Sequence, residues 1–152
     1  MSLQVEVNDP TNFAMCDSSR FALEAEAIGF AGVGMPDHPH TGRDVFVRLA
    51  AAAHVTQQIV LFPSVANPVT RNARTLAILA RSLDEIAPGR TRLILGGGDN
   101  AVKFAGKPPA TVAELIDAVR LIRSDLAGTD IKVFINASSP RMLNAAGVAA
   151  DG

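Results

Sequence analysis

IVLFPSVANP (residues 59–68) and RLILGGGDN (residues 92–100) are two apolar runs that flank one amphipathic helix, and this stretch decides the fold. Both runs lack the apolar–polar alternation of a half-exposed strand, which predicts strands buried on both faces. The helix between them carries apolar side chains at helical spacing and ends at Pro88-Gly89. Two parallel strands joined by a helix form a βαβ unit, whose ligands bind at the carboxyl ends of the strands. We therefore expect the chemistry at residues 64–67 and 96–99.

The rest of the chain continues this alternation of strands and helices. Asp44 begins one helix, Thr111 forms a capping box with Glu114 at the start of another, and Ser139-Pro140 opens the last. Five strands alternating with five helices predict a parallel α/β fold, which we expect to form one domain over residues 1–152. The other predicted elements are strands at residues 3–7, 32–35 and 131–135, a helix at about residues 19–28, and a loop at residues 103–109.

Two architectures fit this pattern. A doubly wound open sheet closes comfortably with five strands in 152 residues. A (β/α)₈ barrel of the TIM type needs eight strands and typically about 250 residues. The pattern alone therefore favours the open sheet.

The composition is that of an ordinary globular protein and excludes several functions. A hydrophobic content of 48% with 19% charged residues excludes disorder. The net charge is −1 and the sequence has no block of basic residues that would attract nucleic acid or an anionic membrane. We therefore expect neither as a partner. Cys16 alone cannot support a disulfide framework, the N-terminal residues lack signal-peptide features, and no apolar run reaches the ~20 residues of a membrane helix. We expect a cytoplasmic protein.

Four segments carry a family resemblance: AEAIGFAGVGMPDH (25–38), VTQQIVLFPSVANPVTRNARTLAILARSLDEIAPGR (55–90), LILGGGD (93–99) and FINASSPRMLNAAGVAADG (134–152). Together they resemble the luciferase-like monooxygenase family, which comprises flavin- and deazaflavin-dependent oxidoreductases. The most specific piece is Val65–Arg71 followed by Leu83–Arg90. Within the family, the sequence is most similar to the methylenetetrahydromethanopterin reductases and glucose-6-phosphate dehydrogenases that use the deazaflavin coenzyme F420.

The resemblance implies the (β/α)₈ barrel, with the five predicted strands as its first five, so the expected fold is a partial barrel. Family members continue through about three more strand–helix units beyond Gly152, and they usually carry an excursion between Gly128 and Ile131. An incomplete barrel leaves the edges of its first and fifth strands unpaired. We therefore expect an artificially truncated chain, a shortened gene product or one half of an assembly, and a homo-oligomer.

Asp37 and His38 follow the second predicted strand, where a barrel collects its catalytic groups. A carboxylate beside an imidazole can set which ring nitrogen carries the proton. The resemblance matches them to an Asp-His pair that lies against the deazaflavin ring. Two alternatives stay open: Asp37 caps the turn while His38 is solvated, or His38 and His40 bind a metal as in barrel hydrolases. The metal site lacks further ligands, because the only other histidine, His54, lies within a predicted helix.

Ser64-Val65 lies where the family places a bulge with a non-prolyl cis peptide bond against the cofactor ring. The alternative is a plain strand end, and Asn67 then either hydrogen-bonds the ring or only begins a turn with Pro68. The run Gly96-Gly97-Gly98-Asp99 lets a ligand approach the backbone because its glycines lack a Cβ. Asp99 matches an acidic residue that some deazaflavin relatives use near the reacting centre, although the run also fits an ordinary loop.

Ala137, Ser138 and Ser139 precede the last predicted helix, whose free amides and dipole favour a phosphate. The resemblance assigns them to the phosphate of the cofactor, while simple capping by Ser139 fits equally well. The arginines at 71, 74 and 81 are interpreted as a solvated helix face, although Arg71 belongs to the family pattern.

The resulting functional hypothesis is hydride transfer between coenzyme F420 and a small substrate, with Asp37, His38 and Asp99 handling the accompanying proton. FMN is the alternative cofactor, in a monooxygenase. A non-catalytic barrel half that dimerises or binds a partner, and an open-sheet phosphate-binding protein, are further alternatives. The expected cofactor-binding residues are Ser64, Val65, Asn67, Gly96, Gly97, Gly98, Ala137, Ser138 and Ser139.

Overall fold

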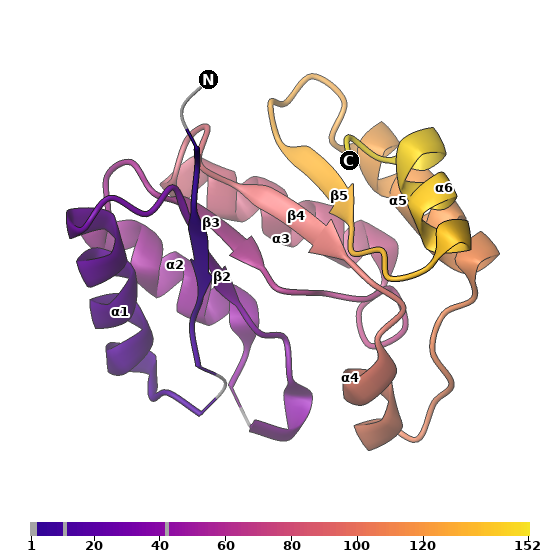
Figure 1. The fold of residues 1–152 in the computed structure, drawn as a ribbon, viewed down its shortest axis with the longest axis horizontal. Coiled ribbons are helices and arrows are strands. Elements are labelled where there is room, and N and C mark those ends of the chain that lie inside the picture. The colour runs from indigo at the N-terminus through magenta and orange to yellow at the C-terminus, as the bar shows by residue number, and fades with distance from the viewer. Residues whose placement is uncertain (1–2, 11, 42) are drawn as a thin grey trace.

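The structure is a computed structural model that describes residues 3–10, 12–41 and 43–152. Strands alternate with helices along this part of the chain (Figure 1). The strands are β1 (Glu6–Asn8), β2 (Gly32–Met35), β3 (Val60–Pro63), β4 (Arg92–Leu95) and β5 (Lys132–Ile135). The helices are α1 (Met15–Ala27), α2 (Val45–Val55), α3 (Ala73–Ile86), α4 (Asp99–Phe104), α5 (Val112–Asp125) and α6 (Pro140–Ala149), with a 3-10 turn, η1 (Pro39–Thr41).

All strand pairs are parallel and follow the order of the chain. β1 pairs with β2, β2 with β3, and β4 with β5. Two isolated bridges, Leu61 to Thr91 and Ala66 to Leu95, join β3 to β4, so the strands form one layer in the order β1-β2-β3-β4-β5. A doubly wound sheet instead reverses its strand order part-way across. The preference for an open sheet, drawn from the pattern alone, is therefore wrong.

An ion pair across the concave face of this layer reflects its curvature. Arg92 on β4 donates from Nη1 to Oε1 of Glu6 on β1, although β2 and β3 lie between these strands. In a flat sheet, three inter-strand spacings would separate β1 from β4 by roughly 14 Å. The Arg92 guanidinium also lies 5.9 Å from the ring centroid of Phe134 on β5. A parallel layer curved in this way is an arc of a (β/α) barrel.

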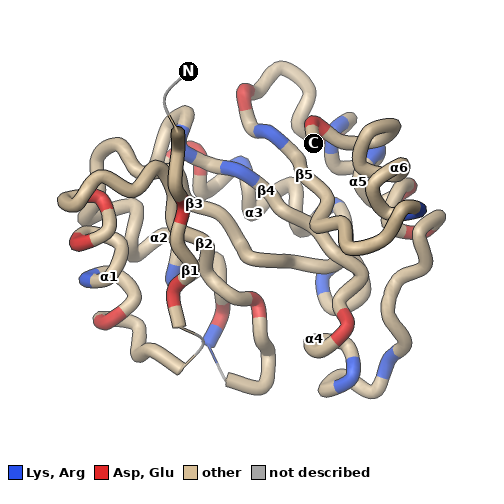
Figure 2. The backbone as a smooth tube through the Cα atoms, in the orientation of Figure 1, with Lys and Arg blue, Asp and Glu red and all other residues tan. Residues whose placement is uncertain are grey.

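The core lies between the strands and the helices that cover their convex side (Figure 1). The apolar stripe predicted for α3 faces the core through Leu76 and Leu83, and α5 faces it through Leu115 and Ile122; all four side chains are buried. Positive and negative residues are interspersed over the surface elements (Figure 2). Within the described residues, no helix combines the length and the apolar character that crossing a membrane requires.

The first two elements differ from their predictions. The strand predicted at residues 3–7 is observed at Glu6–Asn8, and Leu3 and Val5 are exposed, so their apolar character did not signal burial. α1 begins at Met15 rather than near Ser19. Its N-cap is Ala14, which makes no side-chain cap, and the sequence therefore carried no start signal there.

The loop predicted at residues 103–109 is wrong at its start, because α4 extends to Phe104. α4 is an additional helix beyond the five that were predicted. It follows Gly98, whose φ is +91°, and carries Asp99 in its first turn. Six residues are too few for an apolar stripe, so periodicity could not reveal the helix. α4 lies apart from the other helices, at the carboxyl ends of the strands (Figure 1).

The outer edge of β5 is not fully unpaired, contrary to the expectation from an incomplete barrel. The Asp151 N–H donates to the Val133 carbonyl at 2.8 Å, and the Ile135 N–H donates to the Gly152 carbonyl at 2.9 Å. The Asp151 carboxylate also accepts from the Val133 N–H at 2.9 Å and pairs with Arg123 on α5. The last two residues thus cover part of this edge.

A buried ion pair after β1 yields a stability prediction. Arg48 on α2 is 1% exposed and donates to Asp9 at 2.6 Å and to Ser18 at 3.0 Å. We expect Arg48→Met to lower the free energy of unfolding by about 3–5 kcal/mol, because it leaves the buried Asp9 carboxylate without a counter-charge. Urea unfolding measures the loss. Arg20→Met, which removes an exposed pair with Asp17, is the control and should change stability by less than about 0.5 kcal/mol. Equally small losses of stability in the two variants would contradict the role of Arg48 as the counter-charge of Asp9.

Candidate functional site

A cavity of about 320 Å³ opens at the carboxyl ends of β2, β3, β4 and β5. The segments that follow each of these strands line it, together with the connection between α4 and α5. Of the twelve predicted site residues, nine line the cavity. The lining residues are Asp37, His38, Ser64, Val65, Gly96, Gly97, Gly98, Asp99, Asn100, Ala101, Pro109, Ala110, Asn136, Ser138 and Met142.

One wall of the cavity is a bulge between β3 and β4. Five residue steps, from Leu61 to Ala66, face four steps from Thr91 to Leu95, so β3 carries one extra residue. The peptide bond between Ser64 and Val65 in this segment is cis, as the family resemblance implied. The extra length brings both residues to the cavity.

The glycine run after β4 brings the backbone close to this bulge. A Cβ on Gly96 would lie 2.9 Å from Cγ2 of Val65, and a Cβ on Gly98 would lie 2.7 Å from Cγ1 of Val102. Gly98 also has a φ of +91°, which side-chain-bearing residues rarely adopt. Asp99, the first residue of α4, is exposed at the mouth of the cavity.

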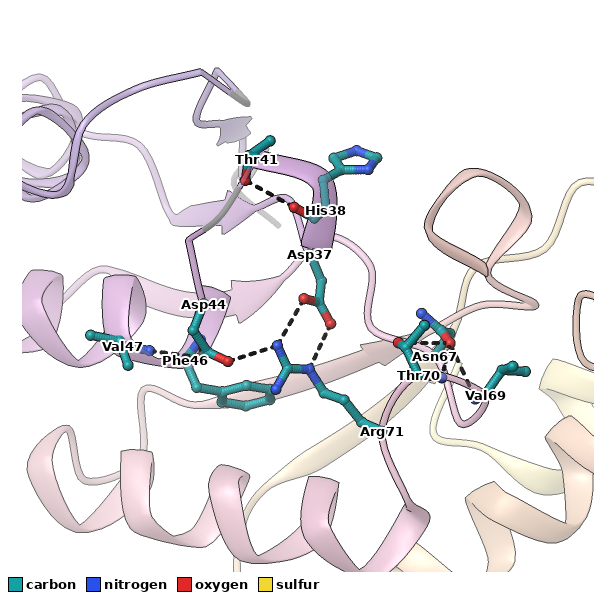
Figure 3. A network of polar contacts seen from close by, with 10 residues as sticks. All are labelled: Asp37, His38, Thr41, Asp44, Phe46, Val47, Asn67, Val69, Thr70 and Arg71. Atoms are coloured by element: carbon teal, nitrogen blue, oxygen red, sulfur yellow. Dashed lines mark hydrogen bonds and ion pairs between the residues drawn. The ribbon is translucent and has the colours of Figure 1, made fainter. Parts of the chain in front are cut away.

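Asn67 lies outside the cavity lining and is fully buried. Its Oδ1 accepts hydrogen bonds from the Val69 N–H at 3.1 Å, the Thr70 N–H at 2.8 Å and the Thr70 hydroxyl at 3.0 Å (Figure 3). Asn67 therefore begins a turn, which was one of its two predicted roles. Its Nδ2 is buried and has no hydrogen-bond partner in the described part of the chain. Such unpaired buried donors are uncommon.

Two carboxylates bind the guanidinium of Arg71, which lies between β3 and α3. Nε donates to Asp37 Oδ2 at 2.9 Å, and Nη2 donates to Asp37 Oδ1 at 3.0 Å and to Asp44 Oδ2 at 2.9 Å (Figure 3). The guanidinium carbon also lies 5.5 Å from the ring centroid of Phe46. The interpretation of Arg71 as part of a solvated helix face is therefore wrong. Arg74 and Arg81, in contrast, are exposed and bond Asp125 at the surface.

These contacts account for two pKa shifts. The hydrogen bonds that Arg71 donates to Asp37, reinforced by the charge of Asp37 and by Asp44, raise the pKa of Arg71 above its ordinary value against the opposing effect of burial. Burial alone would raise the pKa of Asp44, but the hydrogen bond and charge of Arg71, with the N–H groups of Val47 and Phe46, lower it. Asp44 is the N-cap of α2, as predicted, so the same carboxylate serves the helix and the arginine.

His38 points away from the Asp37–Arg71 pair and lines the cavity (Figure 3). Its carbonyl accepts from the Thr41 N–H at 3.0 Å and the Thr41 hydroxyl at 2.8 Å, so Thr41 rather than Asp37 closes this turn. Burial lowers the pKa of His38, and so does His40, whose ring centroid lies 5.1 Å away; Asp37 opposes them. The imidazole is therefore mainly neutral at pH 7, and its Nδ1 is buried without a partner in the residues described.

The alternative of a metal site finds no further ligands near His38 and His40. The residues that the structure describes contain no group of three or more His, Cys, Asp or Glu side chains placed to hold a metal ion. His40 instead lies against Phe104 of α4, with ring centroids 5.6 Å apart.

The serine segment before α6 is divided between two roles. Ser138 lines the cavity, whereas Ala137 and Ser139 do not. Ser139 is the N-cap of α6 and accepts from the Met142 N–H at 3.3 Å. Sequence reasoning missed Asn100 and Asn136 as lining residues; Asn136 directly follows β5, so its position at a strand end was an available signal.

The glycine run provides a matched pair of variants. We expect Gly98→Ala to lower the free energy of unfolding by about 2–3 kcal/mol, because it combines a positive φ with a clash against Val102 and Asn67. In Gly97→Ala the nearest atom lies 3.5 Å away, an ordinary contact, so its effect should stay below about 1 kcal/mol. Denaturant unfolding of both variants measures the difference. A Gly98→Ala protein as stable as the parent would show that the run is not closely packed.

The lowered pKa of His38 predicts a pH dependence. Protonation of His38 is less favourable in the folded than in the unfolded chain, so its contribution to stability is complete above the ordinary pKa of about 6.5 and is lost as the pH falls below it. We expect His38→Gln to reduce the stability lost between about pH 7.5 and pH 5.5. Urea unfolding at both pH values measures this. An NMR titration midpoint for His38 above its ordinary pKa would contradict the assignment.

Comparisons with known proteins agree with this arrangement. The sequence model of the family described as luciferase-like monooxygenase matches residues 5–133. The 5,10-methylenetetrahydromethanopterin reductase of Methanolobus tindarius is 32% identical over 159 aligned positions, which cover 88% of this chain and 48% of the relative. The chain thus spans about half the length of that protein.

Two solved structures share the fold. The coenzyme F420 dependent tetrahydromethanopterin reductase from Methanopyrus kandleri matches with a TM-score of 0.86 over 100% of this chain and 55% of its own, at 22% identity. An F420-dependent secondary alcohol dehydrogenase, in complex with an F420–acetone adduct, matches with a TM-score of 0.82 over 98% of this chain and 57% of its own, at 19% identity. Because the family model covers most of the chain, the protein belongs to the luciferase-like monooxygenase family, and its parallel strand–helix units form part of a TIM-type barrel.

Proposed function

We propose that this chain provides the cofactor site of an oxidoreductase that transfers a hydride between coenzyme F420 and a small substrate. The observation that carries the proposal is the cavity, which collects nine of the twelve predicted site residues at the carboxyl ends of four strands. Similar proteins support the proposal. Two similar structures are named as F420-dependent enzymes, and a relative in sequence is a methylenetetrahydromethanopterin reductase.

The residues present fit such a ring-bearing cofactor. A volume of about 320 Å³ lies within the range of roughly 300–1,000 Å³ for ligand pockets. The glycine run and the Ser64–Val65 bulge give the ring a wall made largely of backbone. Asn67 packs behind this wall: its Cγ would lie 2.8 Å from a Cβ on Gly98, and its buried Nδ2 has no partner in the described residues. Ser138 and the free amides at the start of α6 would hold the phosphate.

When bound, coenzyme F420 supplies the ring carbon that carries the hydride. The chain contributes positioning and proton handling. Val65 and the glycine backbone exclude water from one side of the ring position. His38 is neutral near pH 7, so it can accept a proton at the cavity wall and return it once protonated. Asp99, exposed at the mouth, is placed to exchange a proton with solvent or substrate.

Spectral titration tests the proposal directly. The purified chain should give a saturable change in F420 absorbance or fluorescence, and FMN should bind more weakly. Gly98→Ala should weaken F420 binding by at least about tenfold, because its Cβ disturbs the wall. Gly147→Ala, at an exposed position of α6 outside the cavity lining, should stay within about threefold of the parent.

The other outcomes separate the competing functions. Tight FMN binding without any F420 response would favour an FMN-dependent monooxygenase. A folded chain that responds to neither cofactor would favour the non-catalytic barrel half. Equal F420 affinity in the two glycine variants would place the ligand away from the glycine run.

A further inference from the structure

Arg71 connects the loops that follow two neighbouring strands, and both loops line the cavity. Asp37 follows β2 and directly precedes His38, while Asp44 closes the same loop as the N-cap of α2. Arg71 itself lies in the loop after β3, which also carries Ser64 and Val65. The guanidinium therefore fixes the His38 loop relative to the bulge.

We propose that Arg71 is a positioning residue for the reaction proposed above, on which this inference rests: by engaging both carboxylate oxygens of Asp37, it keeps Asp37 out of proton transfer and holds His38 at the cavity as the proton-handling group of this loop. Asp37 then serves as an anchor rather than as one of the proton-handling groups of the functional hypothesis.

The geometry of the pair carries this assignment. The two hydrogen bonds of 2.9 and 3.0 Å use both Asp37 oxygens in the bidentate arrangement that suits a guanidinium. A proton placed on either oxygen would displace one of these N–H donors. The Asp37 side chain is 2% exposed and that of Arg71 19%, so solvent could not easily replace the lost partner. His38 makes neither of these bonds and faces the cavity instead (Figure 3).

The charges of the pair also act on His38. The negative charge of Asp37 raises the pKa of His38. Arg71 is ion-paired to Asp37, and a positive charge placed there acts on a neighbouring imidazole in the opposite sense. The other charged or titratable groups described on this loop are His40, Arg43 and Asp44, and α4, which packs against η1, carries Asp99 and Lys103. Removing Arg71 also frees Asp44 from its ion pair, whereas Asp37→Asn leaves the contact between Arg71 and Asp44 in place.

NMR titration of the His38 ring protons in the cofactor-free chain tests the proposal. Arg71→Met should raise the pKa of His38, because Asp37 then acts on it without compensation. Asp37→Asn should lower it, because Arg71 then lacks its main counter-charge. Arg74→Met is the matched control, since it removes an exposed arginine paired with Asp125, and it should leave the His38 titration unchanged. A dispersed amide spectrum shows that each variant is folded.

Opposite shifts in the two variants would support the positioning role, which a merely structural ion pair distant from His38 would not produce. An unchanged His38 titration in the folded variants, or shifts of the same sign, would overturn it. If Arg71→Met does not fold, the nearly isosteric Asp37→Asn variant decides alone. Titration of the same samples with F420 tests the proposed function separately, because the His38 pKa is measured without cofactor.

Discussion

Two backbone hydrogen bonds of Ala66 connect the chain after β3 to β4, and they hold the two parts of the strand layer together at the cavity. Its N–H donates to the Ile94 carbonyl at 3.0 Å, and its carbonyl accepts from the Gly96 N–H at 2.9 Å. Buried backbone groups must be paired, and Pro63 just before this point has no N–H to offer. The chain after β3 resumes its pairing with β4 at Ala66 after one extra residue, and Ser64 and Val65, just before this point, line the cavity.

Two arginines, one buried and one partly buried, then fix the loops at this end of the layer. Arg48 on α2 holds Asp9 at the end of β1, and Arg71 holds Asp37 after β2 together with the start of α2. Each pair links a strand end to a helix or loop far away in the sequence. A buried ion pair is weak evidence for added stability, but its fixed geometry specifies position. At this end of the layer, position is what a site requires, because loops carry the reactive groups and strands only support them.

Much of this arrangement could be predicted from local patterns. β2 was predicted with its observed bounds, and the caps at Asp44, Thr111 and Ser139 were predicted at the right residues, because capping depends on side chains adjacent in sequence. α4 and the start of α1 were missed, since one is too short for periodicity and the other lacks a capping side chain. Strand order and the pairing of Arg71 with Asp37 required three-dimensional information, because residues 34 positions apart carry no local signal of contact. The resemblance, rather than periodicity, correctly favoured the barrel.

The most direct test of the central claim, that the cavity at the strand ends binds the deazaflavin, is an amide chemical-shift map of the ¹⁵N-labelled chain during titration with coenzyme F420. We expect the largest shifts on Val65, Gly96, Gly97, Gly98 and Ser138, with small changes on the outer helices. Shifts concentrated on the outer faces of α3 and α5, or saturable binding without shifts around the glycine run, would contradict it.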